Sequence, residues 1–325
     1  MCTRVLYETG TGTYIVGRNA DWNDMTAKVD LWLFPRGLKR DGGVGKDPVK
    51  WTSKYGSVIT GFYANVSADG MNEKGLVCNL LYQVEADYGD PKQTGRPTLS
   101  LGGWLQYVLD NFPTVAETVK VMQPDPFTVI SGNFGNGRPA NVHFSLSDAV
   151  GDSAIFEFLG GKLVIHHSRD YKVMTNSPIF EQQLAINTYW DLVGGKNMLP
   201  GTISAADRYV RACYALKVSP KFEDRREAVA SIFSQMRAVS PPLGMSDPEK
   251  PNISSTLYRI VADSDAMRYY FDNVLDPSVF WVDLAKVDLS EGAKTMRLAV
   301  MGPVDLAGDI SAKFTPAEPY EFLRP

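Results

Sequence analysis

Residues 1–22 read MCTRVLYETGTGTYIVGRNADW, and this stretch contains two short β-rich segments, Thr3 to Glu8 and Tyr14 to Asn19. The intervening Thr9-Gly10-Thr11-Gly12 is typical of a hairpin connection, because glycine adopts the backbone conformations that tight turns need. We therefore expect an antiparallel pair at the start of the chain, with Cys2 beside its first strand.

Blocks of strands and blocks of helices alternate along the rest of the chain. Further strands are expected at 30–34, 51–63 and 75–82, with turns at Asp69-Gly70 and 72–75. Helical periodicity follows at 99–112 and 114–122. The same patterns predict strands at 140–146, 153–159, 162–167 and 171–175, helices at 179–192, 204–216 and 225–239, and final strands at 257–262, 267–271, 279–284 and 296–300.

Strands grouped with strands indicate the α+β class with antiparallel sheets, rather than a doubly wound parallel fold. A four-layer αββα sandwich satisfies two groups of helices and several groups of strands. We find no internal repeat and no low-complexity linker, so a single domain over residues 1–325 is expected. The Gly/Asn-rich residues 131–137 are expected to form a long surface loop.

The composition excludes several classes of protein. The 325 residues are 44% apolar with a net charge of -4, which is typical of a globular chain and argues against a general nucleic-acid binder. No apolar run approaches the roughly 18 residues that a membrane helix needs. Three cysteines and three histidines, without C-x-x-C or H-E-x-x-H spacing, predict neither a disulfide framework nor a metal site.

The first residues lack the basic and apolar regions of a targeting segment. The expected compartment is therefore the cytoplasm, or the periplasm if a signal peptide has been removed.

Cys2 is the first candidate for chemistry. Removal of Met1 would give one residue both a thiol and a free α-amine, and an α-amine with an ordinary pKa of roughly 7.7–8.0 can be neutral near pH 7–8. Such an amine can take the thiol proton during attack and later give it to a leaving amine. The alternative is a cysteine that lies near a terminus without a role.

Arg18 and Asp21 are the next candidates. In a regular strand, residues three apart face opposite sides, so both reach one site only if the chain bends, which Gly17 and Asn19 would tolerate. The carboxylate could then hold the new ammonium group, and the guanidinium could favour the thiolate. The alternative is a surface ion pair at a hairpin end, worth at most about 1 kcal/mol.

Six sequence blocks, in order, are similar to the choloylglycine hydrolase family, which contains penicillin V acylases and conjugated bile salt hydrolases among the N-terminal nucleophile hydrolases. The blocks are MCTR at 1–4, GRNADW at 17–22, WTSKYGSV at 51–58, GMNEKGL at 70–76, MTNSP at 174–178, and LPG at 199–201 with ADRYVRA at 206–212. The longer blocks most resemble the Gram-negative branch.

This resemblance implies an αββα fold, a homotetramer, and hydrolysis of a carbon–nitrogen amide bond in a small-molecule N-acyl substrate, without a cofactor. It places the nucleophile at Cys2 and gives positioning roles to Arg18 and Asp21. Asn176 is implied as an oxyanion and orienting residue, and Arg208 as a residue that shapes the charge around the thiolate. Tyr82 falls at a variable oxyanion or substrate position, and Trp22 matches an aromatic residue of the acyl pocket.

Alternatives exist for these roles and for the substrate. Asn176 could instead cap the following helix, and Arg208 could form a solvated pair with Asp207. Cys78 and Cys213 are interpreted as small core residues, and at most one of His166 and His167 should face inward. Trp22 favours a penicillin V acylase that also acts on N-acyl homoserine lactones, whereas Tyr82 keeps a bile salt hydrolase as the alternative. A non-catalytic relative that retains Met1 and binds acyl ligands is a hypothesis of another class.

Overall fold

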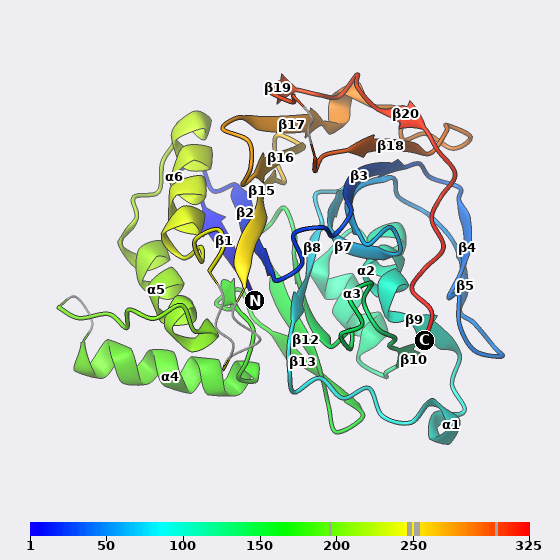
Figure 1. Cartoon of the computed structure of the whole chain (residues 1–325), viewed down its shortest axis with the longest axis horizontal. Helices are drawn as coiled ribbons and strands as arrows, with labels where there is room; N and C mark the ends of the chain where they lie inside the picture. The colour runs from blue at the N-terminus through cyan, green and yellow to red at the C-terminus, as the bar shows by residue number, and fades with distance from the viewer. Residues whose placement is uncertain (195–196, 246–248, 250–253, 303–304) are drawn as a thin grey trace.

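The computed structural model describes residues 1–194, 197–245, 249, 254–302 and 305–325. Two large sheets form its centre (Figure 1). No helix in the described part of the chain has the length and apolar character needed to cross a membrane.

The first sheet has seven strands and holds both ends of the N-terminal hairpin. Its strands, in spatial order, are β14 (Val173–Met174), β1 (Cys2–Glu8), β2 (Tyr14–Trp22), β15 (Ser255–Asp263), β16 (Arg268–Asn273), β17 (Val279–Asp283) and β19 (Gly308–Asp309). All neighbours are antiparallel except β17 and β19. The predicted hairpin is confirmed, with Cys2 paired to Ala20.

The second sheet has nine antiparallel strands. In spatial order they are β13 (Lys162–His167), β12 (Ser153–Leu159), β11 (Val142–Ser147), β8 (Val77–Tyr82), β7 (Val66–Asn72), β6 (Ser57–Phe62), β3 (Val29–Phe34), β18 (Met296–Ala299) and β20 (Thr315–Pro316). Two small ribbons accompany it, β4 (Lys39–Asp41) with β5 (Lys50–Thr52) and β9 (Thr98–Ser100) with β10 (Thr128–Ile130).

Helices cover the outer faces of both sheets (Figure 1). On the seven-stranded sheet lie α4 (Phe180–Val193), α5 (Ala205–Val218) and α6 (Arg225–Ala238), with α5 against β1 and α6 against β2 and β15. The nine-stranded sheet is covered by α2 (Leu101–Asn111) and α3 (Val115–Met122). The short helices are α1 (Pro91–Thr94) and the 3-10 turn η1 (Leu284–Lys286). The predicted αββα architecture is confirmed.

The prediction of a turn at Asp69-Gly70 is wrong, because both residues lie inside the buried strand β7. Aspartate and glycine are typical of turns, but here the carboxylate of Asp69 is buried against Arg18. Gly70 lets two backbones approach closely, since a Cβ at this position would lie 2.7 Å from the carbonyl oxygen of Val58. The predicted strand 51–63 is likewise two strands, β5 and β6, separated by residues 53–56.

Candidate active site

Cys2 lies at the start of β1, where the two sheets meet. Its side chain is buried and lines a cavity together with Arg18 and residues of β8 from the opposite sheet. Arg18 Nη2 donates to Cys2 Sγ at 3.5 Å and to the carbonyl oxygen of Leu80 at 3.1 Å. The Cys2 sulfur is therefore in direct contact with a guanidinium group.

Arg18 is held in place by a carboxylate that the sequence did not reveal. Its Nε lies 3.1 Å from Asp69 Oδ1, and both side chains are buried. Asn79 Nδ2 donates to Asp69 Oδ1 at 3.0 Å, and Tyr258 Oη donates to Asp69 Oδ2 at 2.9 Å. Burial would lower the pKa of Arg18, but Asp69 and the other neighbouring acidic groups together raise it above its ordinary value. The ion pair therefore fixes a permanent positive charge beside the thiol.

Asp21 and Arg208 form a second buried pair on the other side of Cys2. Arg208 Nη1 lies 3.6 Å from Asp21 Oδ2 and donates to the Cys2 carbonyl oxygen at 2.6 Å. Thr256 Oγ1 donates to Asp21 Oδ1 at 2.6 Å. Burial raises the pKa of Asp21, and Arg208 opposes that rise. The Asp207–Arg208 alternative is wrong, because Asp207 instead accepts hydrogen bonds from Thr202.

β2 continues through Arg18 and Asp21, and the two side chains face opposite sides of it: Arg18 contacts the Cys2 sulfur and β8, whereas Asp21 pairs with Arg208 of α5. The irregularity lies in the partner strand: the register with β15 shifts between Thr256 and Tyr258, opposite Asp21 and Ala20. The bend that the sequence suggested at Gly17 or Asn19 is therefore not present, because the two side chains lie on opposite faces of β2, as in a regular strand.

Asn176 follows β14 and bridges Cys2 to the opposite sheet. Its Oδ1 accepts from the Cys2 backbone nitrogen at 2.5 Å and from Arg208 Nη2 at 2.9 Å. Its Nδ2 donates to the Tyr82 carbonyl oxygen at 2.6 Å. The helix-cap alternative is wrong, because Ile179 occupies the N-cap position of α4 and makes no side-chain cap bond.

The backbone of Tyr82 also faces the site. The nitrogen of Gln83 donates to the carbonyl oxygen of Asn141. Because successive residues of a strand direct their N–H and C=O groups to opposite edges, the N–H and C=O of Tyr82 point to the other edge of β8. At that edge the register with β7 ends at Asn79. The Tyr82 N–H is thus directed toward the side from which Asn176 approaches.

Aromatic side chains form the wall of the cavity beyond Cys2. The Trp22 ring lies 5.6 Å from Tyr82, 5.3 Å from Phe134 and 6.3 Å from Phe62 between centroids. Trp22 Nε1 donates to Tyr63 Oη at 2.9 Å, which fixes the orientation of the indole. The loop at 131–137, predicted only as a surface loop, supplies Phe134 to this wall, a role that no local pattern indicated.

Met1 occupies the position next to the thiol residue. Its amine is buried and donates to the Asp21 carbonyl oxygen at 2.6 Å, and the Asp21 nitrogen donates to the Met1 carbonyl oxygen at 2.9 Å. Burial lowers the pKa of this amine. Met1 therefore extends the β1–β2 pairing by one residue and covers the backbone of Asp21.

The remaining cysteines and the tandem histidines lie away from Cys2. Cys78 is fully buried in the core, as predicted, whereas Cys213 is only half-buried. His166 faces inward to Glu157, and His167 faces Asp152 at the surface, so the alternation predicted for this strand is confirmed. Among the described residues, no group of three or more His, Cys, Asp or Glu side chains is arranged to hold a metal ion.

The fold and the site define an enzyme class: residues 2–302 match the model of the linear amide C–N hydrolases, choloylglycine hydrolase family, and the chain belongs to this family. The hypothesis of a non-catalytic binding protein is therefore not favoured.

The chain is more similar to penicillin V acylases of this family than to a bile salt hydrolase/transferase. The chain is 44% identical to a penicillin V acylase of Pectobacterium atrosepticum, over 99% of this chain and 92% of the relative. It resembles the structure of a penicillin V acylase from Agrobacterium tumefaciens with a TM-score of 0.92 and 45% identity, covering 99% of each chain. A bile salt hydrolase/transferase of Clostridium perfringens is 25% identical, over 89% of this chain and 94% of the relative.

Proposed function

We propose that this chain hydrolyses the amide bond of N-acyl substrates with a bulky apolar acyl group, with Cys2 as the nucleophile after removal of Met1. The observation that carries the proposal is the position of the Cys2 thiol: it lies beside the guanidinium of Arg18, at the base of an aromatic-walled cavity. Arg18, Asp21, Asn176 and Arg208 have the supporting roles implied by the family resemblance.

The α-amine of Cys2 acts as the base. The Cys2 nitrogen already bonds to Asn176 Oδ1, and this bond would orient it after Met1 is removed. Asp21 Oδ2 is buried and has no hydrogen-bond partner in the described structure. Arg208 Nη1 lies 3.6 Å away, too far for a hydrogen bond, and an ammonium group at residue 2 would supply the missing donor. Asp21 therefore stabilises the protonated amine that forms during attack.

The reaction proceeds through a thioester. The amine takes the thiol proton, the sulfur bonds to the substrate carbonyl carbon, and a tetrahedral oxyanion forms. The amine then gives the proton to the substrate nitrogen, and the carbon–nitrogen bond breaks. Water, deprotonated by the same amine, attacks the thioester, releases the carboxylic acid and restores the thiol.

Asn176 and the Tyr82 N–H are the proposed donors to the oxyanion. Asn176 follows β14 of the seven-stranded sheet, and Tyr82 ends β8 of the nine-stranded sheet. The bond from Asn176 Nδ2 to the Tyr82 carbonyl oxygen holds the two residues together. Loss of one such donor typically costs about 2.7–4 kcal/mol of transition-state stabilisation.

The aromatic wall supports a flat or long apolar acyl group. Trp22, Tyr82 and Phe134 surround the space beyond the thiol. Together with the relatives named as penicillin V acylases, this wall supports penicillin V, with its phenoxyacetyl group, as the leading substrate, and long-chain N-acyl homoserine lactones as a second class. Bile salt conjugates are the alternative, supported by the more distant relative.

Initial rates on penicillin V, an N-acyl homoserine lactone, glycocholate and taurocholate test the substrate. We expect kcat/KM for penicillin V to exceed that for either bile conjugate by at least about 10-fold, because the cavity wall is aromatic and close to the thiol. A higher kcat/KM for the bile conjugates would reverse the assignment while leaving the mechanism intact.

We also infer a homotetramer. Apolar side chains are strongly exposed on α4 and at the end of α5, notably Tyr189, Leu192 and Val218. Exposed apolar groups of this kind are typical of surfaces that associate. The molar mass from light scattering, expected at four chains, measures the assembly.

A further inference from the structure

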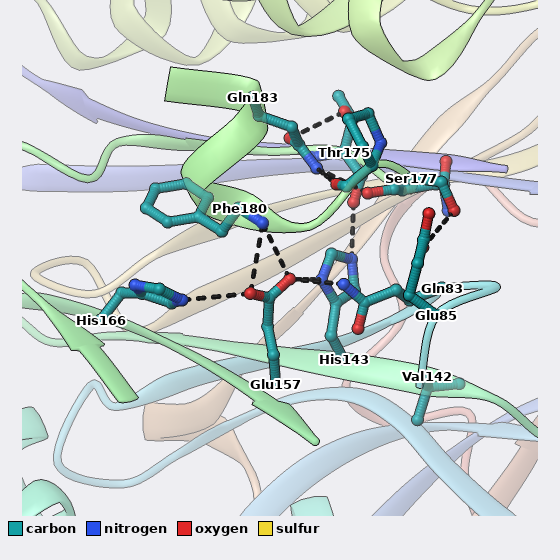
Figure 2. Close-up of polar contacts among 12 residues, drawn as sticks. Gln83, Glu85, Val142, His143, Glu157, His166, Thr175, Ser177, Phe180 and Gln183 are labelled. Carbon is teal, nitrogen blue, oxygen red and sulfur yellow. Dashed lines mark hydrogen bonds and ion pairs between the residues drawn. The ribbon is translucent and has the colours of Figure 1, made fainter. Parts of the chain in front are cut away.

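A second buried polar network joins Glu157, His143 and Thr175, the residue before Asn176 (Figure 2). Its centre is Glu157 on β12, whose side chain is fully buried. The carboxylate accepts hydrogen bonds from the side chain of Gln83, from the Phe180 backbone nitrogen at 3.0 and 3.2 Å, and lies 3.0 Å from His166 Nε2. The many hydrogen bonds to this buried carboxylate fix its position.

His143 links Glu157 to the segment that carries Asn176. Its Nδ1 lies 3.4 Å from Glu157 Oε1, and its Nε2 lies 2.7 Å from the carbonyl oxygen of Thr175. A carbonyl oxygen only accepts, so Nε2 carries a hydrogen and donates it. Burial alone would raise the pKa of Glu157, but hydrogen bonds from His143 and His166 hold it at about 2.

The network includes the chain neighbours of both proposed oxyanion donors, Asn176 and the Tyr82 N–H. Thr175 directly precedes Asn176, and Gln83 directly follows Tyr82. Glu157 and His143 belong to the nine-stranded sheet, whereas Thr175 follows β14 of the seven-stranded sheet. The bond from His143 to Thr175 therefore joins the two sheets one residue away from the side chain that bonds to Cys2.

We propose that His143, oriented by Glu157, is a positioning residue for the amide hydrolysis, and that its hydrogen bond to the Thr175 carbonyl oxygen sets the reach of Asn176 toward the reacting carbonyl. This inference rests on the proposed function. His143 does not contact the thiol, but we expect it to affect kcat. Small displacements of catalytic groups such as Asn176 slow reactions strongly.

Two substitutions separate this role from a purely structural one. In His143→Gln the amide nitrogen takes the place of Nε2, so donation to Thr175 is kept and contact with Glu157 is lost. In His143→Asn the amide nitrogen takes the place of Nδ1, so contact with Glu157 is kept and donation to Thr175 is lost. We expect His143→Gln to keep kcat within about 5-fold and His143→Asn to lose about 30–100-fold, with KM changed less than about 3-fold in both.

Alkylation of Cys2 by iodoacetamide supplies the second readout. Alkylation uses the thiolate but forms no oxyanion, so its rate should stay within about 2-fold of wild type in both variants. It also counts the folded sites, so kcat is expressed per reactive Cys2. His167→Asn is the matched control, because His167 lies on the other face of β13 and pairs with Asp152.

Equal losses of kcat in the two variants, or alkylation that falls in parallel with hydrolysis, would overturn the inference. The Gln variant also tests it alone: a folded His143→Gln that loses kcat about 30-fold or more contradicts the role of the Thr175 bond. A wild-type chain, freed of Met1, that is alkylated but hydrolyses no amide would instead overturn the proposed function, and this inference with it.

Discussion

Replacing Cys2 with alanine is expected to reduce kcat by at least about 10⁴-fold, because the substitution removes the only atom proposed to bond to the substrate. The free energy of unfolding should change by about 1 kcal/mol or less, since one sulfur atom is lost beside an existing cavity. Hydrolysis of penicillin V and thermal unfolding of the same preparations measure the two effects.

Cys213→Ala is the matched control for this substitution. Cys213 is half-buried on α5 and lies apart from the cavity that Cys2 lines, so kcat should be unchanged. If Cys2→Ala kept full activity, Cys2 would not be the nucleophile.

Replacing Asp69 with asparagine should destabilise the fold by about 3–5 kcal/mol, because the guanidinium of Arg18 would remain buried without its counter-ion. The activity should fall as well, since Arg18 would lose the contact that holds it beside the thiol. Urea unfolding and hydrolysis rates on the folded fraction measure the two losses separately.

The double variant Arg18→Met with Asp69→Leu separates stability from catalysis. Removing both charges should restore much of the stability, because no buried charge is left unpaired, while the activity stays low. Asp191→Asn is the control, since its pair with Lys217 is exposed and should contribute less than about 1 kcal/mol. An Asp69→Asn variant as stable and active as wild type would contradict the role of the buried pair.

Local patterns predicted most of the fold. Helices α2, α4, α5 and α6 begin and end close to the predicted residues, and β12 and β13 match their predicted ranges, because helical and strand periodicity are short-range signals. The strand β7 was missed because its Asp69-Gly70 pair has the local character of a turn. The Asp69 carboxylate is instead buried as the partner of Arg18, which is distant in the sequence.

The site was predicted only in part, for the same reason. Cys2, Arg18 and Asp21 were candidates on their own chemistry. Asn176 and Arg208 came only from the family resemblance, and the structure brings all five residues together. The groups that hold or surround them come from other elements. Tyr258 on β15 and Phe134 in the 131–137 loop reach the cavity through pairing and packing that no local pattern encodes.

The free amine at residue 2 is the central claim, and an N-terminal extension with a protease site directly before Cys2 tests it most directly. Hydrolysis of penicillin V is measured before and after cleavage, and intact mass gives the fraction of chains that begin at Cys2. We predict no hydrolysis by the extended chain and a rate proportional to that fraction after cleavage. Equal rates for the extended and cleaved chains would contradict the mechanism.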